Sequence, residues 1–138
     1  MQVKDLKGFD FRSICPLSSA LDIIGDKWTL LILRDIVFFK KNTFSQFADS
    51  DEGIATNILS NRLKMLMDLD LLEKTSHPSN KKTILYQLTQ KGEDFIPVML
   101  ELIVWSSKHL DDHVAKESKG FAEMYLRDRD TVVDNFRA

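Results

Sequence analysis

Residues 55–69 carry side chains whose types suit hydrogen bonding to another molecule. At 100° per residue, short hydroxyl and amide groups with one lysine fill an arc of about 140° on a predicted helix, formed by Thr56, Asn57, Ser60, Asn61 and Lys64. Asparagine can pair with adenine through two hydrogen bonds, serine and threonine bond several base edges, and lysine bonds guanine or phosphate. A helix face that is merely solvated remains the alternative, although such a face usually carries more Glu and Lys.

The other side of this helix is apolar. Leu59, Leu63 and Leu66 fall within about 60° of one another, which predicts that they pack in the core. Arg62 points nearly opposite the centre of the polar arc. We therefore expect Arg62 to form a structural ion pair or to contact a flanking phosphate, and not to contact a base.

Two short strands are predicted after this helix, over residues 71–75 and 83–88, joined by residues 77–82. The connection is basic, and we predict that Asn80, Lys81 and Lys82 contact a DNA backbone or minor groove. This pattern is typical of the wing of a winged helix-turn-helix.

The elements before the helix fit the same architecture. Pro16 opens a predicted helix to about Ile24, and Asp26 is the predicted N-cap of a buried helix that ends at Val37. Thr43 is expected to cap a helix of about two turns, followed by a turn at residues 49–53. The order of these helices and strands predicts a mainly α protein with a small β-hairpin, which is the architecture of a winged helix-turn-helix.

The C-terminal third is predicted to be helical. Thr89 is expected to cap a long helix through Leu110 that is kinked at Pro97, and an amphipathic helix follows His113. We expect this last helix to form a dimer, with packing on its own domain as the alternative. The predicted organisation is a flexible arm at 1–14, a winged-helix domain at 15–110 and a dimerisation helix at 111–138.

Composition places these segments in one globular chain of 138 residues, with 43% hydrophobic and 29% charged residues. The net charge is −2, but residues 55–91 hold six basic and three acidic side chains and so carry +3. A basic segment on an acidic body favours a nucleic-acid partner. The sequence contains neither an apolar run of about 20 residues nor an apolar N-terminal leader, so we expect a cytoplasmic protein without a membrane partner.

Residues 15–105 resemble the HxlR family of winged-helix regulators. The matching positions are Cys15-Pro16, Ala20-Leu21, Ile24-Gly25-Asp26-Lys27-Trp28, Phe44-Ser45, Gly53-Ile54, Leu59, Leu63, Leu66, Leu71, Tyr86, Leu88-Thr89, Gly92 and Trp105. The resemblance implies a dimeric repressor or activator that binds a pseudo-palindromic operator in double-stranded DNA, with residues 55–69 as recognition helix. It also implies dimer contacts from the first and last helices. We predict that the dimer residues are Leu17 in the first helix, Trp105 near the end of the long helix, and Phe121, Met124, Tyr125, Val132 and Phe136 in the last.

Three positions depart from the family pattern. Ala55 stands where the family usually has a capping Ser, which costs the helix about 1 kcal/mol of capping. Asp70 replaces a Gly at a position where positive φ is expected, a conformation that Asp tolerates better than most residues. Lys81 replaces a proline in the wing, which predicts a more mobile and more cationic hairpin.

Cys15 is the single cysteine and the one candidate for redox chemistry. The free N–H groups at the start of a helix favour a thiolate, and in some members of the family a cysteine at this position senses oxidants or electrophiles. Because there is no second cysteine, the oxidised form is an intersubunit disulfide, a mixed disulfide or an adduct. The alternative is a small, partly buried packing residue.

Other functions fit the sequence poorly. His109 and His113 are spaced for zinc, but Leu110 occupies the place of the catalytic Glu of zinc proteases. There is no glycine-rich phosphate loop, and no Ser/His/Asp arrangement is suggested by spacing, so we expect no enzyme activity, metal or cofactor. The serious alternative is a winged helix that docks a protein, which would lack the steep salt dependence of DNA binding.

Overall fold

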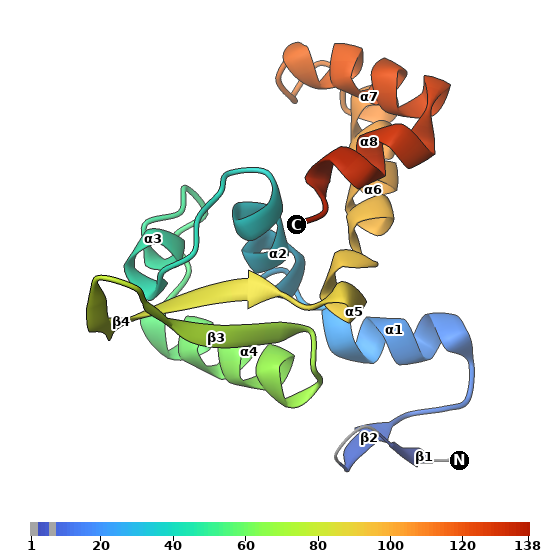
Figure 1. Ribbon diagram of the computed structural model, residues 1–138. Coiled ribbons are helices and arrows are strands. Elements are labelled where there is room, and N and C mark those ends of the chain that lie inside the picture. Colours follow the sequence, from blue (N-terminus) through green and yellow to red (C-terminus); the bar gives the residue numbers. More distant parts are fainter. Residues whose placement is uncertain (1–2, 6–7) are drawn as a thin grey trace. The chain divides into compact units, whose positions relative to one another are not determined.

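The computed structural model describes residues 3–5 and 8–138, and their side chains from residue 8 onward (Figure 1). The chain divides into two compact units, Met1–Thr89 and Gln90–Ala138. The division falls at the end of the wing and not near residue 110, where the sequence suggested a boundary. In the part of the chain that the structure describes, no helix is long and apolar enough to span a membrane.

A β-hairpin occupies much of the segment predicted to be a flexible arm. Strand β1 (Val3–Asp5) pairs antiparallel with β2 (Phe9–Phe11). Phe11 is 7% exposed, and the rings of Phe9 and Phe11 lie 4.8 Å apart. Arg12 forms an ion pair with Asp22, so the arm is tied to the next helix. Residues 1–2 and 6–7 of the predicted arm lie outside the described residues.

Helices α1 (Pro16–Ile24) and α2 (Thr29–Val37) follow. Gly25 ends α1 as predicted, and only glycine fits at this position, because a Cβ there would lie 2.3 Å from the carbonyl oxygen of Leu21. Helix α2 begins two residues later than an N-cap at Asp26 would place it. The Asp26 carboxylate nevertheless accepts hydrogen bonds from the N–H groups of Trp28 at 2.8 Å and Thr29 at 3.0 Å, and so caps this first turn.

Helix α3 (Phe44–Ala48) is capped by Thr43 as predicted. The Thr43 hydroxyl accepts from the Gln46 N–H at 3.3 Å, and the Gln46 side chain accepts from the Thr43 N–H at 3.1 Å, which forms a capping box. The helix is shorter than the two turns expected, because the Asp49 N–H already closes it.

The next helix, α4 (Thr56–Asp68), matches its prediction closely. Ala55 makes no side-chain capping bond, and the chain leaves the helix through Asp70 at φ +63°, which confirms the positive φ expected there. Leu59, Leu63 and Leu66 are 0–2% exposed and form part of the core of the first unit.

The wing consists of β3 (Leu72–His77) and β4 (Asn80–Leu88) in an antiparallel pair that runs from Leu72 opposite Leu88 to His77 opposite Asn80. The strands are longer than predicted, and the expected loop at 77–82 is reduced to a tight turn at 78–79. Asn80, Lys81 and Lys82 therefore begin β4 and do not form a loop, and the Asn80 side chain accepts from the Lys82 N–H at 3.1 Å. Figure 1 shows β3 running beside α4, and these elements are in contact.

The C-terminal unit contains α5 (Gln90–Glu93), α6 (Ile96–His109), α7 (Glu117–Arg127) and α8 (Arg129–Phe136). The prediction of one long, kinked helix is wrong, because the helix is interrupted between Glu93 and Ile96. Pro97 lies in the first turn of α6, where its missing N–H leaves no helical hydrogen bond unmade. The predicted final helix is two helices, because the Asp128 side chain accepts from the Thr131 N–H at 3.3 Å and starts α8. Both α7 and α8 contact α6.

Candidate nucleic-acid interface

The polar arc predicted for residues 55–69 lies on the exposed side of α4. All five of its side chains are exposed, namely Thr56, Asn57, Ser60, Asn61 and Lys64. The three leucines on the opposite side are among the most deeply buried side chains of the first unit. Packing therefore fixes the rotation of α4 about its axis, and this rotation turns short hydrogen-bonding groups outward.

Arg62 has the structural role expected for it. Its Nε lies 3.2 Å from Oδ1 of Asp26, and its Nη1 donates to the Asn61 side-chain oxygen at 2.6 Å. Burial raises the pKa of Asp26, but hydrogen bonds from Thr29, Trp28 and Arg62 outweigh it, so the pKa lies below the ordinary value. The ionised carboxylate connects the start of α2 to the middle of α4.

A charged cluster that the sequence reasoning missed holds the turn between α3 and α4. Arg34 donates to both carboxylate oxygens of Glu52, at 2.7 and 2.9 Å. Asp35 is 2% exposed; it accepts from Arg34 at 2.8 Å and from the Ser50 hydroxyl, and lies 3.8 Å from the Lys41 ammonium. The hydrogen bond from Arg34 lowers the pKa of Glu52 to about 2. The cluster thus anchors residues 50–52 to α2.

The wing presents its predicted contacts at the start of β4, where Asn80, Lys81 and Lys82 are all exposed. Apart from its pairing with β3, β4 is held by the loop before α3, because the Tyr86 N–H donates to the Asn42 carbonyl at 2.8 Å. The Tyr86 ring lies 5.9 Å from that of Phe47. These attachments lie near the base of the hairpin, and the basic residues lie beyond them.

The predicted dimer residues separate into two groups. Leu17, Trp105 and Met124 are 69%, 56% and 45% exposed and are accessible to a second subunit. Tyr125 and Val132 are 2% and 5% exposed, so their assignment to an interface is wrong: they belong to the core of their own chain. Phe121 and Phe136 are partly buried and contact each other, with ring centres 6.0 Å apart.

Cys15 is a free, exposed thiol immediately before α1. Its exposure contradicts the alternative of a partly buried packing residue. Its N–H donates to the Ser13 hydroxyl at 3.2 Å, and its carbonyl accepts the Ser19 N–H at 2.9 Å, so the backbone around it is held by local bonds. The thiol is accessible to small oxidants and to another chain.

Comparison with known proteins agrees with this architecture. A family model described as HxlR-like helix-turn-helix matches residues 23–114. The HTH-type transcriptional regulator MT3179 of Mycobacterium tuberculosis is 36% identical over 111 residues, which cover 80% of this chain and 67% of that protein.

Solved structures show the same fold. The structure of PA1607 aligns with a TM-score of 0.65 and 31% identity over 76% of this chain and 70% of that one. The reduced form of the Bacillus subtilis regulator YodB aligns with a TM-score of 0.57 and 25% identity, over 74% of this chain and all of YodB. YodB has also been solved after diamide treatment, a form that aligns with a TM-score of 0.53 and 26% identity. Since the family model covers most of the chain, this protein belongs to the HxlR-like helix-turn-helix family of transcriptional regulators.

Proposed function

We propose that this protein acts in the cytoplasm as a homodimeric, sequence-specific DNA-binding regulator, with α4 as the helix that reads bases in the major groove. The observation that carries the proposal is the exposed arc of Thr56, Asn57, Ser60, Asn61 and Lys64 opposite three buried leucines. A helix positioned by its core residues holds short amide and hydroxyl groups in fixed directions, as base-edge recognition requires.

The wing is proposed to contribute affinity without selectivity. Lys81 and Lys82 are exposed on β4, and long ammonium side chains suit phosphate oxygens, which are the same in every sequence. Neutralising phosphates releases counterions, so we expect binding to weaken steeply with salt. A winged helix that docks a protein would not show this dependence on duplex DNA.

Exposed apolar side chains support the homodimer. Helix α1 presents Leu17 and Leu21, which are 69% and 46% exposed, and α6 presents Val98, Leu102 and Trp105 at helical spacing, 37–56% exposed. Apolar stripes of this kind usually mark a protein interface. A two-fold dimer would bind a pseudo-palindrome with half-sites about 34 Å apart, or a multiple of this distance.

Cys15 is proposed as a thiol switch. The residue is exposed beside α1, and the related YodB has been solved in reduced and diamide-treated forms. With one cysteine per chain, diamide would take two hydrogen atoms from the Cys15 thiols of two subunits, leaving one disulfide and a reduced hydrazine. Such a bond would constrain the α1 helices of the dimer and so alter the spacing of the two recognition helices.

The decisive experiment measures fluorescence anisotropy of the protein with its own upstream DNA and with a scrambled duplex, across a salt series, with and without diamide. We expect specific, salt-steep binding that diamide alters in the wild type but not in Cys15→Ser. Equal binding to both duplexes by an intact dimer would contradict sequence-specific recognition and would favour a protein-docking winged helix. An unchanged diamide response in Cys15→Ser would refute the thiol switch alone.

The dimer is tested separately by sedimentation equilibrium. Leu17→Glu and Trp105→Glu place charges in the proposed interface, so we expect each variant to shift the protein toward monomer. Ile84→Glu is the matched control, because Ile84 is a 41% exposed apolar residue of the wing. Dissociation by all three variants, or by none, would contradict the assignment of α1 and α6 to the interface.

A further inference from the structure

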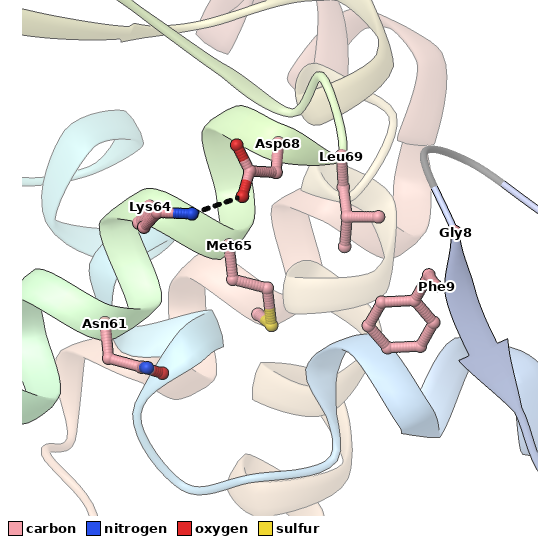
Figure 2. Close-up of a pocket in the computed structure, with 7 residues that line it drawn as sticks. All are labelled: Gly8, Phe9, Asn61, Lys64, Met65, Asp68 and Leu69. Atoms are coloured by element: carbon pink, nitrogen blue, oxygen red, sulfur yellow. Dashed lines mark hydrogen bonds and ion pairs between the residues drawn. The ribbon is translucent and has the colours of Figure 1, made fainter.

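A pocket lies between the N-terminal hairpin and the second half of α4 (Figure 2). Its volume is about 340 Å³, at the lower end of the range for pockets that bind small organic molecules. The hairpin contributes Gly8 and Phe9, and α4 with the residue after it contributes Asn61, Lys64, Met65, Asp68 and Leu69. Four of these α4 positions follow helical spacing, so one stripe of the recognition helix forms the wall facing β2.

One part of the pocket is apolar and suited to a planar ring. Figure 2 shows the Phe9 ring and the Met65 thioether extending toward the same space, with Leu69 beside them. Phe9 and Met65 are both partly exposed, so a bound ring would cover apolar surface that now contacts solvent. Aromatic rings pack well on another ring and on a thioether sulfur.

The opposite part of the pocket offers hydrogen-bond donors. The Asn61 side-chain oxygen already accepts from Arg62 at 2.6 Å, which leaves its NH₂ group as the donor. The Lys64 ammonium lies 3.0 Å from Asp68, but the two side chains are 76% and 57% exposed, so this ion pair is weak and exchanges readily. An acceptor oxygen brought by a ligand could therefore contact both Asn61 and Lys64.

We propose that this pocket binds a small aromatic carboxylate, with its ring between Phe9 and Met65 and its carboxylate on Lys64 and Asn61 in place of Asp68. The regulatory consequence rests on the proposed function. Asn61 and Lys64 belong to the arc assigned to base recognition, so a bound carboxylate occupies donors that DNA needs. Ligand and operator then compete for the same two side chains.

The binding step is tested without DNA, by titrating the full-length protein with 1-naphthoate in isothermal calorimetry or NMR. The neutral 1-naphthalenemethanol and the non-aromatic cyclohexanecarboxylate are the matched probes. We expect saturable binding of 1-naphthoate that is roughly tenfold tighter than that of either probe, since each lacks one of the two recognised features. Absence of saturable binding, or equal binding of all three, would overturn the site.

Variants locate the binding. Phe9→Ala should weaken 1-naphthoate binding roughly tenfold, whereas Phe39→Ala, which removes another exposed ring of the first unit, should leave it unchanged. Asp68→Asn removes the competing carboxylate and should tighten 1-naphthoate several-fold without affecting the neutral alcohol. Urea unfolding curves that match the wild type establish that each variant folds. A Phe9→Ala protein that is folded and binds normally would refute the pocket as the site.

Competition with DNA is the last step. Adding 1-naphthoate to the complex of the protein with its upstream DNA should release the duplex from the wild type but not from Phe9→Ala at the same concentration. Binding of 1-naphthoate with no release of bound DNA would refute the competition while leaving the pocket intact. If no specific DNA complex forms at all, the proposed function fails, and the calorimetric result still decides the pocket.

Discussion

The proposed recognition helix α4 and the wing each present an exposed surface, but the core supports the two surfaces very differently. Helix α4 carries its polar arc on a backbone whose opposite face is buried by Leu59, Leu63 and Leu66. The basic residues of the wing lie at the far end of a two-stranded hairpin whose outer half contains exposed residues on both strands. Four of the five side chains of the arc are short, whereas the basic side chains of the wing, Lys81 and Lys82, are long and less constrained in direction.

This contrast supports the different roles proposed for the two surfaces in DNA binding. Directional hydrogen bonds discriminate bases only when the donor and acceptor are held in position, which α4 achieves through core packing and the Arg62–Asp26 contact. Attraction to phosphate tolerates motion because it depends weakly on direction. We therefore assign selectivity to α4 and general affinity to the wing, and the following predictions test that assignment in order of expected effect.

The largest effect is expected from the core face of α4. Leu63→Ala removes a side chain that is 2% exposed, so the free energy of unfolding should fall by about 2–5 kcal/mol. Ile84→Ala on the wing, where the side chain is 41% exposed, should change it by less than about 0.5 kcal/mol. Urea denaturation measures both, and equal losses would show that the wing is as firmly packed as the helix.

The next effect concerns base discrimination. Asn57→Ala removes an exposed amide from the arc and should reduce the preference for operator over scrambled DNA by about 1–3 kcal/mol, the value of one bidentate base contact. Asn135→Ala removes an exposed amide from α8 and is the matched control. Competition anisotropy gives the preference. If Asn57→Ala weakened both duplexes equally, the residue would be a backbone contact.

The double variant Lys81→Ala/Lys82→Ala should instead weaken operator and scrambled DNA alike. If each ammonium neutralises one phosphate, the slope of log affinity against log salt should decrease by about one per lysine. Lys119→Ala, an exposed lysine of α7, should leave the slope unchanged. A loss confined to the operator would assign base recognition to the wing and would reverse the proposed division.

The smallest effect is expected at the turn that leads into α4. Because Arg34 lowers the pKa of Glu52 from 4.5 to about 2, the ionised pair stabilises the fold above pH 4.5, and this stabilisation disappears as the pH falls toward 2. Glu52 is 38% exposed and screened by solvent, so Glu52→Gln should cost less than about 1 kcal/mol at pH 7.

The Glu52 effect is measured as the difference in urea midpoint between the wild type and Glu52→Gln across this pH range. The exposed Glu123→Gln is the control and should not alter the midpoint. If the difference in urea midpoint persisted near pH 2, the Glu52→Gln variant would be destabilised by lost packing contacts and not by the loss of an ion pair.

Much of α4 and its surroundings was predictable from the sequence because local rules govern it. The 3.6-residue period separates the arc from the leucines, and the Thr43 capping box spans four residues. The positive φ of Asp70 is expected from the resemblance, because the family usually has a Gly at this position. Predictions failed where two local rules compete. Pro97 predicts a kink inside one helix, but proline is equally common in the first turn of a helix, which is its position in α6.

The sequence by itself determined which residues of α4 share a face and the order of the elements from α1 to β4, because periodicity, capping and turn residues act over a few positions. Only the tertiary structure decided that the Asp35 carboxylate contacts the side chains of Arg34, Ser50 and Lys41. It also decided that Tyr125 is buried while its neighbour Met124 is exposed. In the same way, only packing places Phe9 across a pocket from Asn61. A helical period specifies an apolar face but not what covers it, and residues far apart in the chain meet only after packing brings their elements together.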